Sequence, residues 1–573
     1  MSSPLRVSLG QYSDRGRKTV NQDFYGACVP QNAQLALKGV AVALADGISS
    51  SAVSQVASES AVSSFLTDYY CTSDAWSVQH CVQQVLRAAN SWLYAQTQQS
   101  PYRDDKNRGY VCTFSGLIIK ANRAHIVHIG DSRIYRLSSQ GVEQITKDHR
   151  LWVDPEHSYL SRALGIDAQC ELEYEVQSIE VGDTFLLVSD GVYEHVDISQ
   201  FAQNLNYRDD DLDRAAKHLV ETAFEQGSDD NLTAQILRID ALPMEIASEV
   251  QQQIDDLPFP PALEPRANFD GYTIVRTLHS SSRSHLYLAQ DHASSRQVVL
   301  KVPSVDMRAN PEYLERFLTE EWIARRLNSA HVLKAALQER KREYLYTVAE
   351  YVPGQTLAQW RVDNPKPDLE TVRGLIEQVA AGLRAFHRMD MLHQDLKPDN
   401  ILIDRGGTVK IIDFGSVRVA GLIEKEPDRL HNHLLGTLMY TAPEYFLGHA
   451  GTTRSELFSL GVLTYTLLSG RFPYGTAVSK ARTLKAQRSL LYRSVLAADR
   501  EIPVWIDETL RKAVDPNPLK RHDAISEFLF DLRHPNPAFA AKNRPPLLER
   551  NPVRFWQIVS ALLAALIIVL LSR

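Results

Sequence analysis

The N-terminal part of the chain contains several apolar runs that end at an aspartate followed by a small residue. These runs are "GVAVALADGIS" (39–49), "AHIVHIGDSR" (124–133) and "DTFLLVSDGV" (183–192), whereas "DDNLTAQILRI" (229–239) begins with aspartates. Continuous or alternating runs rich in β-branched residues and bounded by turn residues are typical of strands. The pattern therefore predicts strands whose ends carry Asp46, Asp131, Asp190 and Asp230.

The second half of the chain follows a different pattern. The run "YTIVRTLHSSSRSHLYLAQD" (272–291) alternates as two strands around a turn, and a further strand ends at Lys301. Apolar residues at helical spacing predict a helix over residues 311–328. Residues 241–268, between the two halves, are rich in proline, which predicts a semi-rigid linker between separate domains.

The C-terminal run "FWQIVSALLAALIIVLLS" (555–572) carries no charge and lies between Arg554 and Arg573. Its length is slightly below the ~20 residues that cross a bilayer, so it predicts a single transmembrane tail anchor. The alternative is a buried C-terminal helix. The preceding segment, 535–554, is basic, and this excess of positive charge predicts that everything upstream stays in the cytoplasm.

The amino-acid composition restricts the classes of protein to which this chain could belong. The 573 residues are 44% apolar and 23% charged, which fits a globular chain with several cores. A net charge of −7, with no stripe of lysine and arginine, gives no electrostatic case for nucleic acid. The five cysteines lack CxxC spacing, as expected for reduced thiols, and the N-terminus has no signal-peptide pattern.

Several aspartates at strand ends favour a hard divalent cation, because Mg²⁺ and Mn²⁺ prefer oxygen ligands. Two such ions about 4 Å apart activate water and clamp a phosphoryl oxygen. A single Asp-Gly pair is more often a simple turn, so the prediction rests on the set. Nearby histidines are acid or base candidates, with a structural role as the alternative: His125, His128, His149 and His157.

Seven motifs, in order, resemble the metal-dependent protein phosphatase family, also called protein phosphatase 2C-like. They are "GRKTVNQD", "ADGIS", "IGDSRIY", "TKDH", "LSRALG", "LLVSDGV" and "SDDNLT", between residues 16 and 233. The resemblance implies an α/β/β/α sandwich of two antiparallel sheets that hydrolyses phosphoserine and phosphothreonine.

The same resemblance implies roles for individual residues. Four carboxylates and one backbone carbonyl would hold a two-metal centre with Mg²⁺ or Mn²⁺: Asp23, Asp46, Asp190, Asp230 and Gly47. Asp131 would lie near a third, weaker metal. The family's phosphate-contacting arginine falls on Lys18, with Arg17 beside it, and either of the two is a candidate for binding phosphate.

Downstream of the proline-rich segment, another ordered set resembles the eukaryotic-type serine/threonine protein kinases. Its motifs are "LYTVAEYVPG", "MLHQDLKPDNILID", "VKIIDFGSV" and "GTLMYTAPEYF", between residues 345 and 446. The resemblance implies a bilobal fold that binds ATP with Mg²⁺ or Mn²⁺ and transfers its γ-phosphoryl group to protein hydroxyls.

The kinase resemblance also implies a set of residues around the nucleotide and its metal ions: Leu278, Leu286, Lys301, Glu320, Glu350, Val352, Asn400 and Asp413. Lys301 would hold the α and β phosphates, and Glu320 would fix Lys301. Asp395 would take or orient the proton of the substrate hydroxyl, and Lys397 would steady the γ phosphate.

The glycine-rich turn of the kinase family is altered in this sequence. Its three glycine positions fall on His279, Ser281 and Ser284. Side chains at these positions keep the backbone further from the phosphates and restrict the conformations of the turn. The charged residues implied around the nucleotide and its metal ions are all present. We therefore expect the domain to use nucleotide more weakly or slowly, but not to have lost this ability. An active kinase is favoured, with a pseudokinase as the alternative.

Two further departures concern regulation. Gln394 replaces the arginine that receives an activation-loop phosphate, so activation by loop phosphorylation is not expected. Glu456 replaces an aspartate and is long enough to reach the catalytic-loop backbone. Glu444 is expected to pair with Arg521 as a structural lock.

These observations predict an α+β multidomain chain. Its parts are a phosphatase domain (1–240), a proline-rich linker (241–268), a kinase domain (269–534), a basic juxtamembrane linker (535–554) and the tail anchor (555–572). The predicted function is a bifunctional signalling enzyme with protein substrates, anchored to a membrane with both domains cytoplasmic. The alternatives are a phosphatase regulated by a nucleotide-sensing pseudokinase and a non-enzymatic membrane scaffold.

Overall fold

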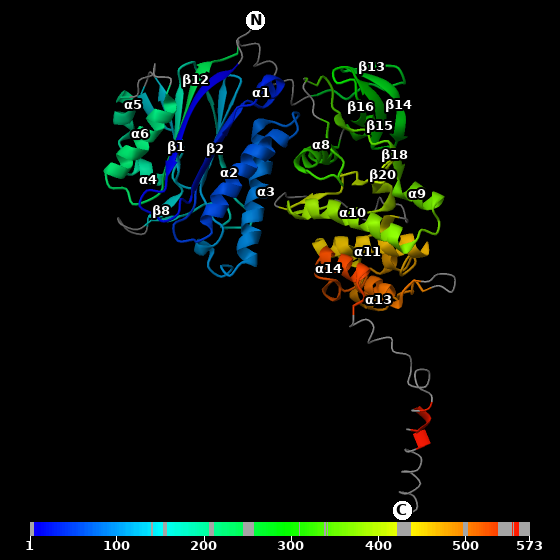
Figure 1. Ribbon diagram of the computed structural model, residues 1–573. Helices are drawn as coiled ribbons and strands as arrows, with labels where there is room; N and C mark the ends of the chain where they lie inside the picture. The colour runs from blue at the N-terminus through cyan, green and yellow to red at the C-terminus, as the bar shows by residue number, and fades with distance from the viewer. Residues whose placement is uncertain are drawn as a thin grey trace, which may run out of the picture.

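The computed structural model describes residues 5–138, 141–152, 158–204, 211–243, 257–308, 310–336, 340, 342–420, 437–496 and 502–536, with a few positions between 553 and 560. Two domains account for nearly all of these residues (Figure 1). The N-terminal domain ends after residue 241, and the C-terminal domain occupies residues 257–536.

The N-terminal domain is built on two antiparallel five-stranded sheets. The first sheet has the order β1 (Arg6–Asp14), β12 (Leu232–Ala241), β11 (Thr184–Val188), β6 (Arg133–Ser138), β7 (Gly141–Gln144). The second has the order β10 (Glu173–Ser178), β5 (Arg123–Ile129), β4 (Phe114–Lys120), β3 (Val40–Asp46), β2 (Asp23–Cys28). The strands predicted from the apolar runs are confirmed as β3, β5, β11 and β12.

Apolar side chains fill the space between the two sheets. Leu44, Leu117, Phe185 and Leu237 are fully buried there, in one cluster that takes residues from both sheets. Since successive side chains of a strand point to opposite faces, the other face of each sheet is also apolar and needs cover. Helices supply that cover: α1 (Asn32–Lys38), α2 (Ser54–Cys71), α3 (Val78–Gln99), α4 (Asp190–Tyr193), α5 (Ile198–Asn204) and α6 (Leu212–Glu225).

Helix α2 packs on β2 and β3 and pairs with α3, whereas α6 packs on β1 and β12. The domain therefore has four layers, as Figure 1 shows, and matches the expected sandwich of two antiparallel sheets flanked by helices. A small ribbon of β8 (Arg150–Trp152) and β9 (Ser158–Leu160) and the short turn η1 (Lys106–Arg108) complete it.

The C-terminal domain has two lobes. The first lobe is a five-stranded antiparallel sheet with one helix, α8 (Pro311–Arg326). The sheet order is β13 (Asn268–Phe269), β14 (Tyr272–Ser280), β15 (Ser284–Asp291), β16 (Gln297–Pro303), β17 (Thr347–Glu350). Helix α8 begins where Asn310 caps it and Pro311 occupies its first turn. The helix predicted over 311–328 is thus confirmed.

The second lobe is mainly helical. Its helices are α9 (Leu357–Asp363), α10 (Leu369–His387), α11 (Thr453–Ser469), α12 (Leu484–Arg488), α13 (Val504–Ala513) and α14 (Ile525–Arg533). Short strands lie toward the first lobe: β18 (Gly354–Thr356), β19 (Met391–Leu392), β20 (Ile401–Asp404), β21 (Val409–Ile411) and β22 (Arg418–Val419). Its single-turn elements are η3 (Pro398–Asn400), η4 (Thr437–Met439), η5 (Pro443–Leu447), η6 (Val478–Lys480) and η7 (Pro518–Lys520), whereas η2 (Val305–Met307) lies between β16 and α8 in the first lobe.

The described end of the proline-rich segment packs on the first lobe. Leu263 is buried among residues of β14 to β17, and the backbone N–H of Leu345 donates to the carbonyl of Pro258 at 3.0 Å. Residues 257–268 thus belong to the C-terminal domain, whereas residues 244–256 lie outside the described residues.

Within the part of the chain that the structure describes, no helix is both long enough and apolar enough to cross a bilayer. The predicted tail anchor at 555–572 lies for the most part outside the described residues.

The expected pair of Glu444 and Arg521 is present and buried. The guanidinium of Arg521 donates to both carboxylate oxygens of Glu444, at 2.7 Å each. Ser455 donates a further hydrogen bond to Glu444 at 2.6 Å. The pair joins η5 and α11 to the segment just before α14.

We predict that Arg521→Ala lowers the free energy of unfolding of the C-terminal domain by about 3–5 kcal/mol, because it leaves the Glu444 carboxylate buried without its cation. Denaturant unfolding of the whole chain measures the loss. The matched control is Arg533→Ala, which removes a half-exposed arginine paired with Glu377 and Glu370 and should cost much less stability. Equal losses in the two variants would contradict the assignment of a buried lock.

Candidate active sites

Strand ends of the N-terminal domain bring its predicted acidic residues together. Asp23 begins β2 and lies opposite Asp46 at the end of β3, because the two strands pair in that register. Asp190 follows β11 at the start of α4, and Asp230 lies two residues before β12. Asp131 lies just past β5. Antiparallel strands of both sheets thus end at one edge of the sandwich, and we call this group of carboxylates the acidic cluster.

The acidic cluster is electrostatically unfavourable without a cation. Burial raises the pKa of Asp23 to about 6, with the Asp230 charge adding to the effect. Burial, and then the charges of Asp23 and Asp190, raise the pKa of Asp46 well above its usual range. Burial, with Asp131 and Asp230, raises the pKa of Asp190 to about 7. Each carboxylate is therefore held close to others that oppose its ionisation.

The donor set fits a divalent cation. Oδ2 of Asp23 accepts from the hydroxyl of Thr233 at 2.6 Å, but Oδ1 is buried and has no hydrogen-bond partner among the described residues. The backbone of Gly47, which follows Asp46, is closely packed. An added Cβ would lie 2.8 Å from Ser54 and 2.9 Å from the carbonyl oxygen of Gln22. The glycine thus lets the backbone, with its carbonyl, stay beside the carboxylates. Clustered oxygen ligands with an orphaned buried oxygen are what Mg²⁺ or Mn²⁺ would satisfy.

The two basic candidates of this site point in different directions. Nζ of Lys18 lies 3.4 Å from Oδ2 of Asp230 and 3.3 Å from the hydroxyl of Ser49. Arg17 instead donates to the carbonyl of Gly227 at 3.1 Å and stacks over the ring of Phe224. The structure therefore brings Lys18 to the acidic cluster and leaves Arg17 away from it.

A functional residue that the sequence pattern does not reveal is Arg150, at the start of β8. Its guanidinium donates to Asp131, to Asp190 at 2.9 Å and to Glu194 at 2.7 Å. Burial tends to raise the pKa of Asp131, and Arg150 opposes that rise. The only signal in the sequence is that Arg150 directly follows the "TKDH" motif.

The histidines near this site have structural roles. Nδ1 of His149 accepts from the backbone N–H of Gly130 at 3.0 Å, which holds the turn before Asp131. Burial lowers the pKa of His128 and of His125 to about 4, so both rings are neutral near pH 7. His157 lies outside the described residues.

The C-terminal domain brings its predicted charges together between its lobes. Lys301 on β16 forms an ion pair with Glu320 on α8, and its Nζ lies 3.7 Å from Oδ1 of Asp413. Burial alone would lower the pKa of Lys301, but Glu320 and Asp413 raise it above its usual value. Lys301 is therefore a fixed positive charge, and Glu320 holds it.

The catalytic-loop residues also lie together. Nζ of Lys397 lies 2.7 Å from Oδ2 of Asp395, and the amide of Asn400 donates to that oxygen at 2.9 Å. Oε1 of Glu456 accepts from the backbone N–H of Gln394 at 2.9 Å, so the prediction that this longer carboxylate reaches the loop is confirmed.

The residues expected to contact the nucleotide lie in the first lobe and at its edge. Leu278 lies on β14 and Leu286 on β15, and both are partly buried. Glu350 ends β17, where its carboxylate accepts from Nζ of Lys410 at 2.6 Å and from the backbone N–H of Lys334 at 3.0 Å. Val352 follows and is buried.

The turn without glycines is closed by a serine. The N–H of Ser281 donates to the carbonyl of Ser284 at 3.1 Å, and the Ser281 hydroxyl accepts from the N–H of Ser284 at 3.2 Å. None of His279, Ser281 and Ser284 adopts the left-handed backbone region that favours glycine. The conformational cost expected from the sequence is therefore not present in this hairpin, because the chain turns without it.

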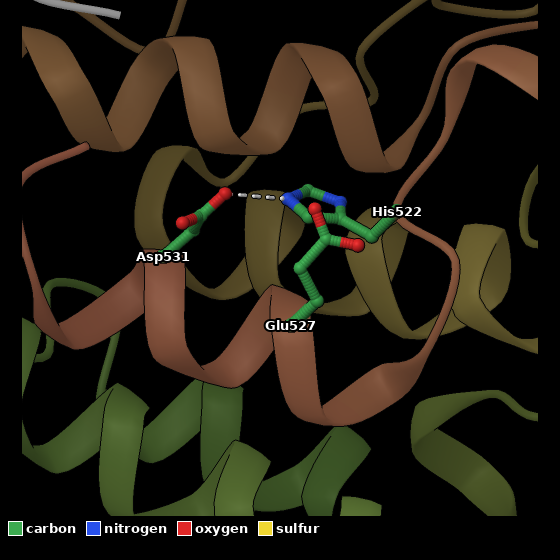
Figure 2. Close-up of side chains that lie close together, drawn as sticks. All are labelled: His522, Glu527 and Asp531. Carbon is green, nitrogen blue, oxygen red and sulfur yellow. Dashed lines mark hydrogen bonds and ion pairs between the residues drawn. The ribbon is translucent and has the colours of Figure 1, made fainter. Parts of the chain in front are cut away.

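Another group of potential metal ligands lies at α14 of the C-terminal domain, and Figure 2 shows its side chains facing one another. Nε2 of His522 lies 3.2 Å from Oδ2 of Asp531. Glu527 accepts from Nζ of Lys512 at 2.6 Å and from the backbone N–H of Asp523 at 2.8 Å. Since both carboxylates have partners within the domain, these contacts explain the group as support for α14.

Comparisons with known proteins divide the chain in the same way. The protein phosphatase 2C family matches residues 11–238, and the protein kinase domain family matches residues 272–537. The serine/threonine-protein kinase PrkC of Bacillus subtilis is 28% identical over 265 residues, which are 46% of this chain and 40% of PrkC. The serine/threonine-protein kinase PknL of Mycobacterium bovis is 28% identical over 294 residues, covering 49% of this chain and 73% of PknL. The chain spans 40% and 52% of the length of the first two curated relatives it matches.

Two solved structures from Mycobacterium tuberculosis illustrate the likeness. The serine/threonine phosphatase PstP/Ppp aligns with a TM-score of 0.35 and 25% identity, covering 41% of this chain and 99% of that one. The PknI kinase domain aligns with a TM-score of 0.36 and 26% identity, covering 47% of this chain and 98% of that one.

We predict that the metal-free protein is less stable than Asp23→Asn above about pH 6. The folded pKa of Asp23 is above its unfolded value, so the ionised form costs stability, and this cost develops between about pH 4 and pH 6. Asparagine keeps the acceptor for Thr233 and removes the charge, so the variant should be more stable by about 1–3 kcal/mol at pH 7.5.

Thermal unfolding with a chelator, at about pH 4.5 and pH 7.5, measures this difference. Adding Mn²⁺ at pH 7.5 should raise the Tm of the wild type more than that of the variant. A stability difference that is the same at both pH values would contradict the raised pKa of Asp23. A wild type whose Tm does not respond to Mn²⁺ would show that the acidic cluster is not a cation site.

Proposed function

The chain joins a protein phosphatase 2C domain to a serine/threonine protein kinase domain, and we propose that it is a bifunctional signalling enzyme that both adds and removes phosphoryl groups on protein serines and threonines. One observation carries the proposal: each domain gathers its charged motif residues around a single point, the acidic cluster in one and the Lys301, Glu320 and Asp413 group in the other. The phosphatase and the kinase act on opposite forms of a protein substrate.

In the kinase domain, Lys301 holds the α and β phosphates of ATP, and Glu320 keeps its ammonium in place. Asp395 lies where it accepts the proton of a substrate hydroxyl, and Lys397, 2.7 Å from it, neutralises charge on the γ phosphate. Leu278, Leu286 and Val352 bound the adenine. Asn400 and Asp413 would hold Mg²⁺ or Mn²⁺, which would supply positive charge for the phosphoryl oxygens.

In the phosphatase domain, four carboxylates and a carbonyl would hold divalent cations: Asp23, Asp46, Asp190, Asp230 and Gly47. Such ions would supply an acidified water and positive charge for the phosphoester. Lys18, 3.4 Å from Asp230, supplies the positive charge that receives the phosphate, and this geometry favours it over Arg17. Asp131, which Arg150 already contacts, would lie beside a third and weaker metal position.

A specific observation also bears on the pseudokinase alternative. That alternative was motivated by the absence of glycines at 279, 281 and 284, but the hairpin closes through Ser281 without left-handed residues. The ion pair of Lys301 with Glu320 is also formed. Both features support an active kinase.

Fusion of opposing activities gives each a high effective concentration at a shared target. The simplest such target is the chain itself, phosphorylated by the kinase domain and cleared by the phosphatase domain.

We further propose that residues 555–572 anchor the chain in a membrane, with both domains on the cytoplasmic side. The support is the uncharged apolar run itself and the basic segment that precedes it.

We predict that labelled ATP with Mn²⁺ separates the two activities. Asp413→Ala should lower incorporation of label by at least about 100-fold, because the nucleotide's metal loses its ligand. Asp46→Ala should keep transfer and accumulate more label than the wild type, since removal is lost. The control is Asp104→Ala, which changes an exposed aspartate that belongs to none of the motifs.

Normal transfer by Asp413→Ala would contradict the kinase assignment, and normal removal of label by Asp46→Ala would contradict the phosphatase assignment. If neither the wild type nor Asp46→Ala incorporates label, the pseudokinase alternative is correct.

We predict that the full chain fractionates with membranes and resists alkaline extraction, whereas a chain ending at Arg554 does not. A length-matched control places charge in the run with Leu563→Arg and Ile567→Arg, each costing about 2.5–3.5 kcal/mol of insertion free energy. This control should also be released. Retention of the truncated chain on membranes would contradict the proposed anchor.

A further inference from the structure

The two domains meet at helix α8 of the kinase domain. Figure 1 shows α2 and α3 on the side of the phosphatase domain that faces the kinase domain, with α8 across from them. One cluster of buried apolar residues runs through both domains at this place and includes Trp76 and Trp322, whose ring centroids are 6.1 Å apart. Trp322 is fully buried. The contact is therefore part of the packed interior.

Charged side chains of α8 form ion pairs and hydrogen bonds with the phosphatase domain. Arg326 forms an ion pair with Asp68 of α2 at 2.7 Å, and both side chains are more than nine-tenths buried. The backbone carbonyl of Thr72 accepts from Arg325 at 3.3 Å, and Asp74 lies 3.7 Å from the same guanidinium. Buried charges are costly unless paired, so these contacts fix how α8 lies against the phosphatase domain.

Glu321 is the centre of the contact. Its carboxylate accepts from the hydroxyl of Ser73 at 3.1 Å and from Arg325 at 2.7 Å. Arg342, from the sheet side of the kinase domain, donates to it as well. Burial would raise the pKa of Glu321, but Arg325 and Arg342 lower it below its usual value. Glu321 is thus ionised and bound to both domains at once.

The phosphatase side of the contact is rigid. Lys38, at the end of α1, is buried and donates to the hydroxyl of Thr72 at 2.8 Å and to the carbonyl of Ser73 at 3.0 Å. Its Nζ also lies 3.7 Å from Asp74. We call residues 72–76, between α2 and α3, the docking loop. Its shape is set within the phosphatase domain by Lys38, so it offers α8 a fixed surface.

Glu320, which holds Lys301, directly precedes Glu321 on the same helix. Neighbouring helical residues point about 100° apart, so one side of α8 faces the nucleotide site while the adjacent side faces the docking loop. We propose that Asp68 and the docking loop are positioning residues for the kinase: they hold α8 where Glu320 pairs with Lys301. This inference rests on the proposed kinase activity and adds a regulator within the same chain.

The test uses charge reversal in the full-length protein. Asp68→Arg and Arg326→Asp each place like charges together at the contact, and the double variant restores an opposite pair. Each single variant should lower kcat for phosphotransfer about tenfold, with a smaller change in KM for the protein substrate. The double variant should recover most of the lost kcat. Ser73→Ala, which removes one hydroxyl and leaves the fold intact, should give a smaller loss in the same direction.

Two readouts distinguish positioning from general damage. Mn²⁺-dependent hydrolysis of p-nitrophenyl phosphate by the phosphatase domain should stay unchanged in all variants. Backbone hydrogen exchange of α8 should become faster in the single variants and return in the double variant. Asp104→Arg, an exposed reversal on the same domain, should change neither quantity.

If the single variants speed the exchange of α8 but leave phosphotransfer unchanged or raise it, the proposal is wrong. Exchange of α8 that does not respond to either reversal also overturns it. If the wild type transfers no phosphoryl group, the kinase assignment fails, and the exchange of α8 still decides whether the docking loop positions this helix.

Discussion

The ion pair between Lys301 and Glu320 depends on where helix α8 lies, and α8 lies between two domains. One side of the helix carries Glu320 toward the nucleotide site, and the adjacent side carries Glu321 and Arg326 into the phosphatase domain. A buried ion pair of this kind tolerates little displacement, because each charge loses its compensation as the distance grows. The position of Glu320 is therefore tied to the contacts that α8 makes with the phosphatase domain.

The two sites differ in how the charges of their buried carboxylates are compensated. In the kinase domain, the acidic residues Glu320 and Asp413 are balanced by Lys301 from the same chain. In the phosphatase domain, Asp23 and Asp46 lie buried, and neither forms an ion pair with a basic side chain among the described residues. Burial and neighbouring carboxylates raise their pKa values. Their mutual repulsion is a stability cost. The first arrangement balances its charges within the chain, whereas the second leaves carboxylates that a bound cation would compensate, as in the proposed function.

Much of this was predictable from the sequence, because strand periodicity and motif order report local geometry. The ends of β3, β11 and β12 carry their aspartates as predicted, and Glu456 reaches the backbone of Gln394. The choice between Lys18 and Arg17 was not predictable, because both follow the same turn and only packing against Phe224 separates them. Arg150 was missed since its partners come from β5, α4 and the residues after it, which no local pattern brings together. Likewise Asp68 and Ser73 look like ordinary surface residues of a helix and its end, and only the neighbouring domain gives them buried partners.

Helix α8 links the nucleotide site to the docking loop. The most direct measurement is hydrogen exchange of residues 72–76 in the full-length protein, with and without ATP and Mg²⁺. Because coupling between sites is reciprocal, nucleotide that fixes Lys301 and Glu320 should also slow exchange in the docking loop. Protection of β16 and α8 by nucleotide, with no change at residues 72–76, would show that the two domains touch without being coupled.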